Sequence, residues 1–100
     1  MNSLMKPQSM EALRREIDTV DRQIIHLLKK RADLIDRAVD LKLKARLPAR
    51  IDSRVEEVVA NVCAQAQELG LAPDLVEEIW RKLIDWSICH EEKTLGKGHI

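Results

Sequence analysis

The chain has 100 residues, enough for one domain with a modest hydrophobic core. Its 17 basic and 17 acidic side chains balance, so it lacks the global basic excess that is typical of nucleic-acid-binding proteins. Its two cysteines are too few and too far apart for a disulfide framework or a metal-ligand pair. No uncharged apolar stretch approaches the roughly 18 residues that a membrane span needs. We therefore expect a cytoplasmic protein that binds neither nucleic acid nor membranes.

The first predicted element is a long amphipathic helix from about Ser9 to about Lys44. Ser9 is a plausible N-cap, Glu11 stands in the first turn, and neither Gly nor Pro follows until Pro48. In alternating steps of four and three, eight of nine positions are apolar, as in a coiled-coil stripe. This apolar stripe consists of Leu13, Ile17, Val20, Ile24, Leu27, Leu34, Ala38 and Leu41, with Arg31 as the single charged position.

The length of this helix predicts a second copy of the chain. At about 1.5 Å per residue the helix spans roughly 50 Å, whereas a compact 100-residue domain has a radius of gyration of about 13 Å. The rest of the chain cannot cover such a rod from end to end. We therefore predict an intertwined homodimer in which the apolar stripe is buried against the partner.

Two shorter helices are predicted after the loop that contains Pro48. The second helix begins at Asp52 or Ser53, where Ser53 and Glu56 match the S-x-x-E capping box, and it ends before Gly70. Its predicted apolar positions are Val55, Val58, Val59, Val62, Ala66 and Leu69.

The third helix is predicted to start at Pro73, which suits a first helical turn, and to run to about Leu95. Its apolar positions include Val76, Ile79, Trp80, Leu83 and Ile84. No strand is predicted. The expected fold is therefore all-α, with a helical domain over 9–95, a flexible N-terminus over 1–8 and a flexible tail over 96–100.

Several polar residues lie on apolar faces. Arg31 interrupts the stripe of the first helix, and Lys42 follows it by eleven residues, about three turns, so both lie on one face roughly 16 Å apart. Such a pair can clamp a small dianion. Arg14 lies at a different azimuth, so it can join the same site only from the partner of an antiparallel dimer.

The third and second helices add further candidates. Ser87 and Glu91 are one turn apart and end an otherwise apolar line, and Arg54 opens the second helix. Each has an ordinary reading when taken alone: Arg54 as a surface cation, Ser87 as a residue bonded back to its own helix, and Glu91 as a partner for a nearby cation. No histidine or cysteine set has metal-ligand spacing, and no Gly-rich phosphate loop is present.

Taken together, these residues resemble the all-helical chorismate mutase family from Leu13 to about Glu92. The resemblance rests on Ala12-Leu13-Arg14-Arg15-Glu16-Ile17, Asp21, Leu27-Leu28, Arg31, Lys42, Pro48, Arg54 and the segment from Ser87 to Glu91. It implies a three-helix, domain-swapped homodimer with two sites, each built from both chains. It also implies conversion of chorismate, a small dicarboxylate, to prephenate without cofactor or metal.

The family pattern implies a role for each matched residue. The partner's Arg14, together with Arg31 and Arg54, would hold the carboxylates, while Lys42 and Glu91 would face the ether oxygen from opposite sides. The implied substrate-binding set is Arg14, Arg31, Lys42, Arg54, Val55, Ser87 and Glu91, of which Arg31, Lys42 and Glu91 are the catalytic candidates.

Two positions depart from the family pattern. Glu91 stands where Gln is usual, and an ionised Glu only accepts hydrogen bonds, so it would help catalysis only when protonated. Val55 stands where a Glu usually binds the ring hydroxyl. Val55 and Trp86 resemble the isochorismate-pyruvate lyase branch of the family, which forms salicylate and pyruvate. That lyase is the alternative function, and a non-catalytic helical dimer is the second alternative.

Overall fold

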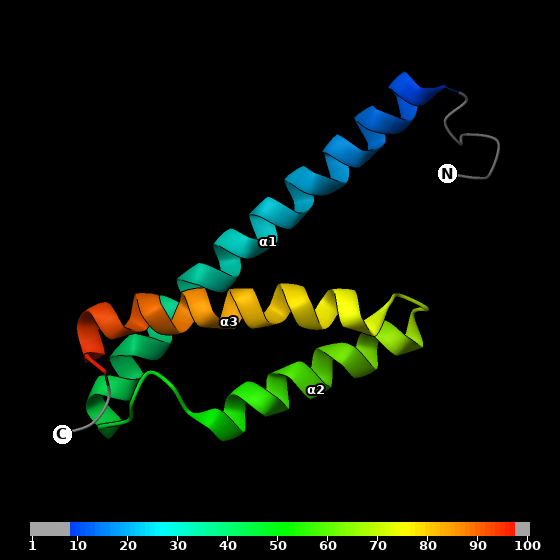
Figure 1. Ribbon diagram of the computed structural model, residues 1–100. Coiled ribbons are helices and arrows are strands. Elements are labelled where there is room, and N and C mark those ends of the chain that lie inside the picture. The colour runs from blue at the N-terminus through cyan, green and yellow to red at the C-terminus, as the bar shows by residue number, and fades with distance from the viewer. Residues whose placement is uncertain (1–8, 98–100) are drawn as a thin grey trace. The chain divides into compact units, whose positions relative to one another are not determined.

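Three α-helices form the computed structural model, which describes residues 9–97 (Figure 1). They are α1 (Met10–Ala45), α2 (Asp52–Glu68) and α3 (Pro73–Leu95), so the predicted helix bounds are confirmed to within a residue or so. The described part of the chain contains no strand, which confirms the all-α class. The flexible N-terminus predicted at 1–8 lies outside the described residues, as does the part of the predicted flexible tail (96–100) that follows Lys97.

The chain divides into two units, and α1 runs through their boundary. The first unit ends at Leu34 and consists, where it is described, of the N-terminal part of α1. The second unit begins at Ile35 and contains the last turns of α1 together with α2 and α3. No helix within residues 9–97 is long and apolar enough to cross a lipid bilayer.

The start of α1 is capped as the sequence predicts. Oγ of Ser9 accepts a hydrogen bond from the backbone N–H of Ala12 at 3.1 Å, and the Ser9 carbonyl accepts one from the N–H of Leu13 at 3.0 Å. Glu11 lies in the first turn, where its charge favours the positive end of the helix dipole. These contacts satisfy backbone donors that a helix start leaves unpaired.

The apolar stripe of α1 is largely exposed in the single chain. Seven of its members have side chains between 41 % and 66 % exposed: Leu13, Ile17, Val20, Ile24, Leu27, Leu34 and Leu41. An aligned row of large apolar side chains in water is uncommon on the surface of a stable monomer.

The end of α1 adopts a left-handed turn without glycine. Arg46 has a φ of 57°, and the N–H groups of Arg46 and Leu47 donate to the carbonyls of Leu43 and Lys42 at 3.3 and 2.9 Å. This is the hydrogen-bond pattern of a Schellman motif, in which glycine usually takes the left-handed position. The turn directs the chain into the loop that carries Ala49, a residue only 3 % exposed.

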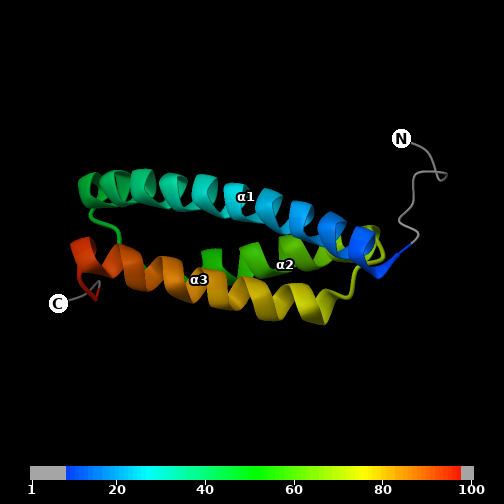
Figure 2. The ribbon, with the colours of Figure 1, turned by 90° about the horizontal axis from the view of Figure 1, so that it is seen from above.

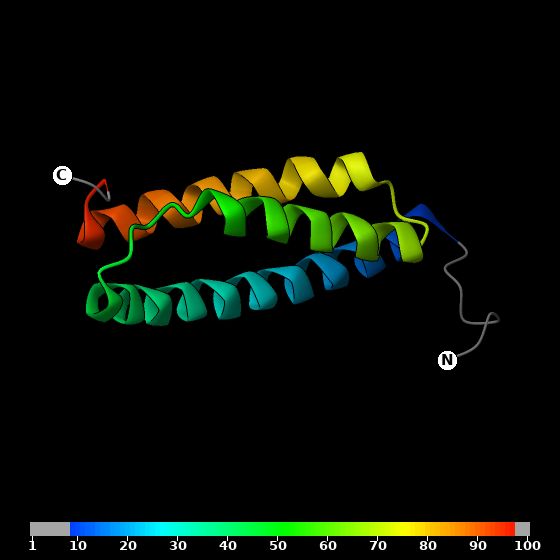
Figure 3. The same cartoon turned by 90° about the horizontal axis from the view of Figure 1, so that it is seen from below.

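The helices α2 and α3 lie side by side and run in opposite directions (Figure 2 and Figure 3). Their contact forms a small core of Ala49, Val59, Ile84 and Ile88, with Val55, Val58, Cys63, Trp80 and Leu95 packed against it. Burial of each large aliphatic side chain contributes about 1.5–3 kcal/mol, so this core holds the pair together.

The turn between α2 and α3 is set by local sequence. Gly70 has a φ of 72°, its N–H donates to the Gln67 carbonyl at 3.1 Å, and the N–H of Leu71 donates to the Ala66 carbonyl at 2.8 Å. This Schellman motif confirms the predicted stop at Gly70. Pro73 then occupies the first turn of α3, as predicted.

Two details of the predicted second helix are wrong. The N-cap of α2 is Ile51, with extended backbone and no side-chain cap, so Ser53 and Glu56 do not form a capping box. Glu56 instead binds Arg81 of α3. Leu69, predicted to be on the apolar face, is 82 % exposed because the helix ends one residue earlier.

Candidate active site

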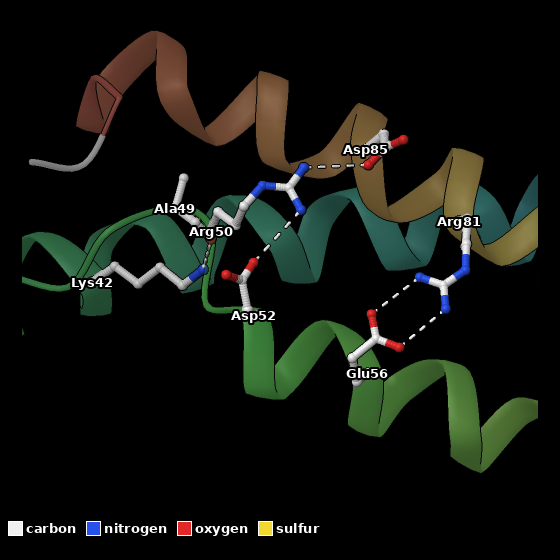
Figure 4. Close-up of polar contacts among 7 residues, drawn as sticks. All are labelled: Lys42, Ala49, Arg50, Asp52, Glu56, Arg81 and Asp85. Carbon is white, nitrogen blue, oxygen red and sulfur yellow. Dashed lines mark hydrogen bonds and ion pairs between the residues drawn. The ribbon is translucent and has the colours of Figure 1, made fainter.

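A buried ion pair joins the last turns of α1 to the last turns of α3. Nζ of Lys42 donates hydrogen bonds to Oε1 of Glu91 at 2.7 Å and to the Ala49 carbonyl at 2.8 Å, a contact that Figure 4 shows. The side chain of Glu91 is only 4 % exposed and that of Lys42 is 19 % exposed. Charges this far removed from water are costly unless they face each other. Two predicted site residues that lie far apart in the sequence are therefore close in space.

Ser87 lies one turn before Glu91 on the buried face of α3. Its Oγ donates to the Leu83 carbonyl at 2.9 Å, the back-bonding that is common for serine within helices. Ser87 and Glu91 are both 3 % exposed, and Ile84 and Ile88 are buried beside them. The polar end of the apolar line on the third helix is thus confirmed as a buried feature.

The two predicted residues at the start of α2 have different surroundings. The side chain of Arg54 is 64 % exposed and its Nη1 donates to Oε1 of Glu57 at 2.9 Å, within the same helix. Val55 is half-buried and packs against the core of α2 and α3. Val55 also lines a pocket, whereas Arg54 is not among the residues that line it.

This pocket has a volume of about 210 Å³ and lies between the start of α2 and the middle of α3. It is lined by Arg50, Asp52, Val55 and Glu56 from the first side and by Arg81, Ile84 and Asp85 from the second. Two aliphatic side chains and five charged ones therefore share its wall. Such a surface suits a small polar ligand that has an apolar part.

Arg81 is the tightly bound cation of the pocket. Its Nη1 and Nη2 donate to the two carboxylate oxygens of Glu56 at 3.2 and 3.0 Å (Figure 4). Its Nε donates to Oε2 of Glu77 at 2.8 Å. The hydrogen bonds that Arg81 donates to Glu56 and Glu77 raise the pKa of its guanidinium above the ordinary value. Hydrogen bonding to Arg81, followed by its charge, lowers the pKa of Glu56 below 4.5. The bidentate geometry ties α2 to α3.

Arg50 is held more loosely. Its Nη2 lies 3.4 Å from Oδ1 of Asp85 and its Nη1 lies 3.9 Å from Oδ1 of Asp52, as Figure 4 shows. All three side chains are substantially exposed, at 48 % for Arg50, 67 % for Asp85 and 87 % for Asp52. Arg50 was not predicted as a site residue, because it lies in a loop where no helical periodicity marks it.

The remaining predicted cations lie in the first unit. Arg14 is exposed and Arg31 is half-buried, both on the N-terminal part of α1. Lys42, Arg54, Val55, Ser87 and Glu91 all lie in the second unit. Arg14 and Arg31 therefore remain predicted site residues.

A second contact between α1 and α3 escaped the sequence analysis. The ring N–H of His90 donates to Oδ1 of Asp36 with Nε2 at 2.7 Å, and the ring of Trp86 stacks on His90 with centroids 4.9 Å apart and planes 8° apart. Since His90 precedes Glu91, this contact helps to hold the end of α3 against α1. The four-residue spacing of Trp86 and His90 is the only local signal for it.

The chemistry available here is electrostatic. The ammonium group of Lys42 can bind an anion or stabilise developing negative charge in a nearly dry place, and Glu91 can accept or donate a hydrogen bond according to its protonation. Among residues 9–97 no group of three or more His, Cys, Asp or Glu side chains is arranged to hold a metal ion.

Comparison with known proteins identifies the family. Residues 13–92 match the family model of chorismate mutase type II. The chain belongs to the chorismate mutase type II family. This membership confirms the resemblance that the sequence analysis drew from Arg14, Arg31, Lys42 and the end of the third helix.

The curated relatives of this chorismate mutase type II chain are longer proteins. It is 33 % identical over 82 residues to the T-protein of Enterobacter agglomerans, covering 82 % of this chain and 22 % of that protein. It is 32 % identical over 89 residues to a bifunctional chorismate mutase/prephenate dehydratase of Aquifex aeolicus (strain VF5), covering 86 % and 25 %. The chain thus spans about a quarter of the length of these relatives. No solved structure matches it significantly.

Proposed function

We propose that the chain catalyses the [3,3] rearrangement of chorismate to prephenate. The observation that carries this proposal is the family match over 13–92, which contains every predicted substrate-binding residue. The Aquifex aeolicus relative carries the words chorismate mutase in its name. The reaction is unimolecular, so a protein accelerates it by holding the substrate in a reactive conformation and by stabilising charge.

In this proposal the cations bind the two carboxylates of chorismate and fold the enolpyruvyl side chain over the ring. Arg31 and the partner's Arg14 bind carboxylates in bidentate fashion. Arg54 assists when its guanidinium exchanges its ion pair with Glu57 for one with a substrate carboxylate. Lys42 lies near the breaking ether bond, where negative charge develops on oxygen. The Ala49 carbonyl, which accepts a hydrogen bond from its ammonium group at 2.8 Å, helps to hold that group in place.

Glu91 takes part only in its protonated form. As a carboxylate it accepts from Lys42 at 2.7 Å and competes with the substrate for that ammonium group. When protonated it donates a hydrogen bond to the ether oxygen and leaves Lys42 free for the substrate. Glu91→Gln, whose neutral amide donates a hydrogen bond, is therefore expected to raise turnover.

The proposal includes an intertwined, domain-swapped homodimer. The apolar stripe of α1 supports it, because seven of its large side chains are 41–66 % exposed in the single chain. A second copy of the chain supplies an identical stripe that would bury them. In that assembly each site receives Arg14 from the partner subunit.

The alternative activity is an isochorismate-pyruvate lyase that forms salicylate. Val55 favours it, because this apolar side chain lines the pocket where a mutase of the family usually places a hydroxyl-binding Glu. Ser87 favours the mutase, as the sequence analysis indicated, so the mutase stands first.

One incubation distinguishes the candidates. The purified chain is given chorismate and isochorismate in separate reactions, and the products are separated by chromatography. Prephenate from chorismate supports the mutase, and salicylate from isochorismate supports the lyase. If neither product forms, both enzymatic proposals are wrong and the result supports the second alternative, a non-catalytic helical dimer.

We also place the activity in the cytoplasm. Both cysteines are free thiols, and the exposed Cys89 suits a reducing compartment. Cell fractionation with detection of the tagged chain tests this location.

A further inference from the structure

We propose that Arg50 is a further substrate-binding residue, which rests on Asp85 in the free protein and transfers to a substrate carboxylate on binding. This inference rests on the proposed function, because it concerns the same site. Arg50 is not among the residues that the family pattern selected. Two features support this role: the pocket between α2 and α3, and the difference in how tightly the two arginines of that pocket are bound by their acidic partners.

The backbone connects both walls of the pocket to the Lys42–Glu91 pair. Arg50 directly follows Ala49, whose carbonyl accepts the hydrogen bond from Nζ of Lys42 at 2.8 Å. On the other wall, Ile84 lies on the same buried face of α3 as Glu91, two turns or about 10 Å earlier along the helix. A substrate held at Lys42 therefore has Arg50 as its neighbour along the loop.

Of the two pocket arginines, only Arg50 is free to move to a ligand. Three hydrogen bonds of 2.8–3.2 Å bind Arg81 to Glu56 and Glu77, so its displacement would break a structural link between helices. The contacts of Arg50 with Asp85 and Asp52 are longer, at 3.4 and 3.9 Å, and lie in solvent. Exposed pairs of this kind contribute little to stability and exchange partners readily.

The backbone on both sides of Arg50 is fixed, which limits the positions that its guanidinium can occupy. Ala49 is 3 % exposed and belongs to the core of α2 and α3, and the Ile51 carbonyl accepts the N–H groups of Arg54 and Val55 at the start of α2. The chain is thus anchored on both sides of Arg50, while its guanidinium is half exposed. An anchored backbone with a mobile planar cation suits bidentate capture of a carboxylate.

The inference makes opposite predictions for the two partners of one ion pair. Arg50→Gln removes the cation and should raise the KM for chorismate about tenfold with kcat within about twofold, the effect of one charge-assisted hydrogen bond. Asp85→Asn removes the competitor of the substrate carboxylate and should lower KM about twofold to threefold. A structural salt bridge would instead give both substitutions the same direction, through a common loss of stability.

The experiment measures kcat, KM and thermal unfolding of the full chain and its variants, with whichever of chorismate and isochorismate the wild type converts. Arg50→Lys should recover most of the lost affinity, and Lys82→Gln, on the exposed side of α3 and outside the pocket lining, should match the wild type. If Arg50→Gln does not fold, a lower KM for Asp85→Asn still supports the inference and an unchanged or higher one overturns it.

The failures of the inference and of the proposed function differ. An active wild type whose KM is unchanged by Arg50→Gln, or raised alike by Arg50→Gln and Asp85→Asn, overturns the role of Arg50 and leaves the proposed function standing. A wild type that converts neither substrate overturns the proposed function and this inference together.

Discussion

At the residue scale, the central feature is a lysine and a glutamate buried together. Removing either partner leaves an uncompensated charge, which typically costs about 3–5 kcal/mol of stability. Glu91→Gln is the mildest change, because the amide keeps the shape of the side chain and still offers an oxygen to Lys42 at the place of Oε1. It also gains a donor that is present at every pH.

The first prediction follows from this exchange. Glu91→Gln should raise kcat by about tenfold over the wild type, because one correctly placed donor to a developing oxyanion contributes at least that much. Initial rates of chorismate loss by the two proteins, measured in the same buffer, test it. Glu92→Gln, the same chemical change at the neighbouring residue, is the matched control. A Glu91→Gln variant that is no faster than the wild type would contradict the role given to Glu91.

Local residue patterns predicted helix ends better than they predicted contacts between helices. Ser9, Gly70 and Pro73 act through their own backbone or through N–H groups three or four residues away, so the sequence alone locates them. Glu56 shows the limit of such reasoning. A capping box was available to it, but a guanidinium 25 residues later offered two charge-assisted hydrogen bonds.

The same distinction applies to the candidate site. Arg31 was predicted because helical periodicity makes a charged side chain in an apolar stripe visible, and Lys42 because it follows Arg31 by about three turns on the same face. Arg50 lies in a loop, which has no period, and Asp85 lies on an exposed helix face, where acidic residues are ordinary. Their proximity depends on how the loop crosses α3, and only the three-dimensional arrangement shows it.

At the element scale, the end of α1 stores strain in Arg46. A non-glycine residue in the left-handed region costs about 1–2 kcal/mol, part of which is offset by the smaller backbone entropy of its unfolded state. Arg46→Gly should therefore raise the free energy of unfolding by about 0.5–1 kcal/mol, measured by urea denaturation at fixed protein concentration. Lys44→Gly, two residues earlier inside the last helical turn, should lower it by about 1 kcal/mol. Equal destabilisation by both variants would show that Arg46 is not strained.

The link between α2 and α3 should depend on acid. Because Arg81 lowers the pKa of Glu56 below 4.5, the stability that this pair adds is fully present above pH 4.5 and is lost as the pH falls through the lowered pKa. The urea concentration at the midpoint of unfolding should therefore decrease when the pH falls below about 4.5, and Glu56→Gln should reduce that decrease. Glu57→Gln, which changes an ion pair within α2, is the control. An identical acid response in the wild type and Glu56→Gln would remove this pair as a contributor.

At the scale of the whole molecule, the apolar stripe of α1 should control assembly. Ile24 is 47 % exposed in the single chain, and Ile24→Asp would place two carboxylates in the seam of the proposed dimer. We expect dimer affinity to fall at least about a hundredfold, seen as a monomer in sedimentation velocity. Gln23→Asp, one residue earlier and off the stripe, should remain dimeric. A wild type that sediments as a monomer would overturn the homodimer.

The proposal that each site uses residues of two chains leads to a stricter prediction. An Arg14→Ala variant and a Lys42→Ala variant should each be inactive, yet their heterodimer contains one site with both wild-type side chains. When equal amounts of the two variants are mixed, unfolded and refolded to exchange subunits, about half of the dimers are heterodimers. One of the two sites in each heterodimer is intact, so the mixture should have about a quarter of wild-type activity. Lys42→Ala mixed with Glu91→Ala is the control. Those two residues meet within a single chain, so each of its sites carries one defect and no activity should return. If the first mixture also stays inactive although its subunits have exchanged, Arg14 does not act across the dimer.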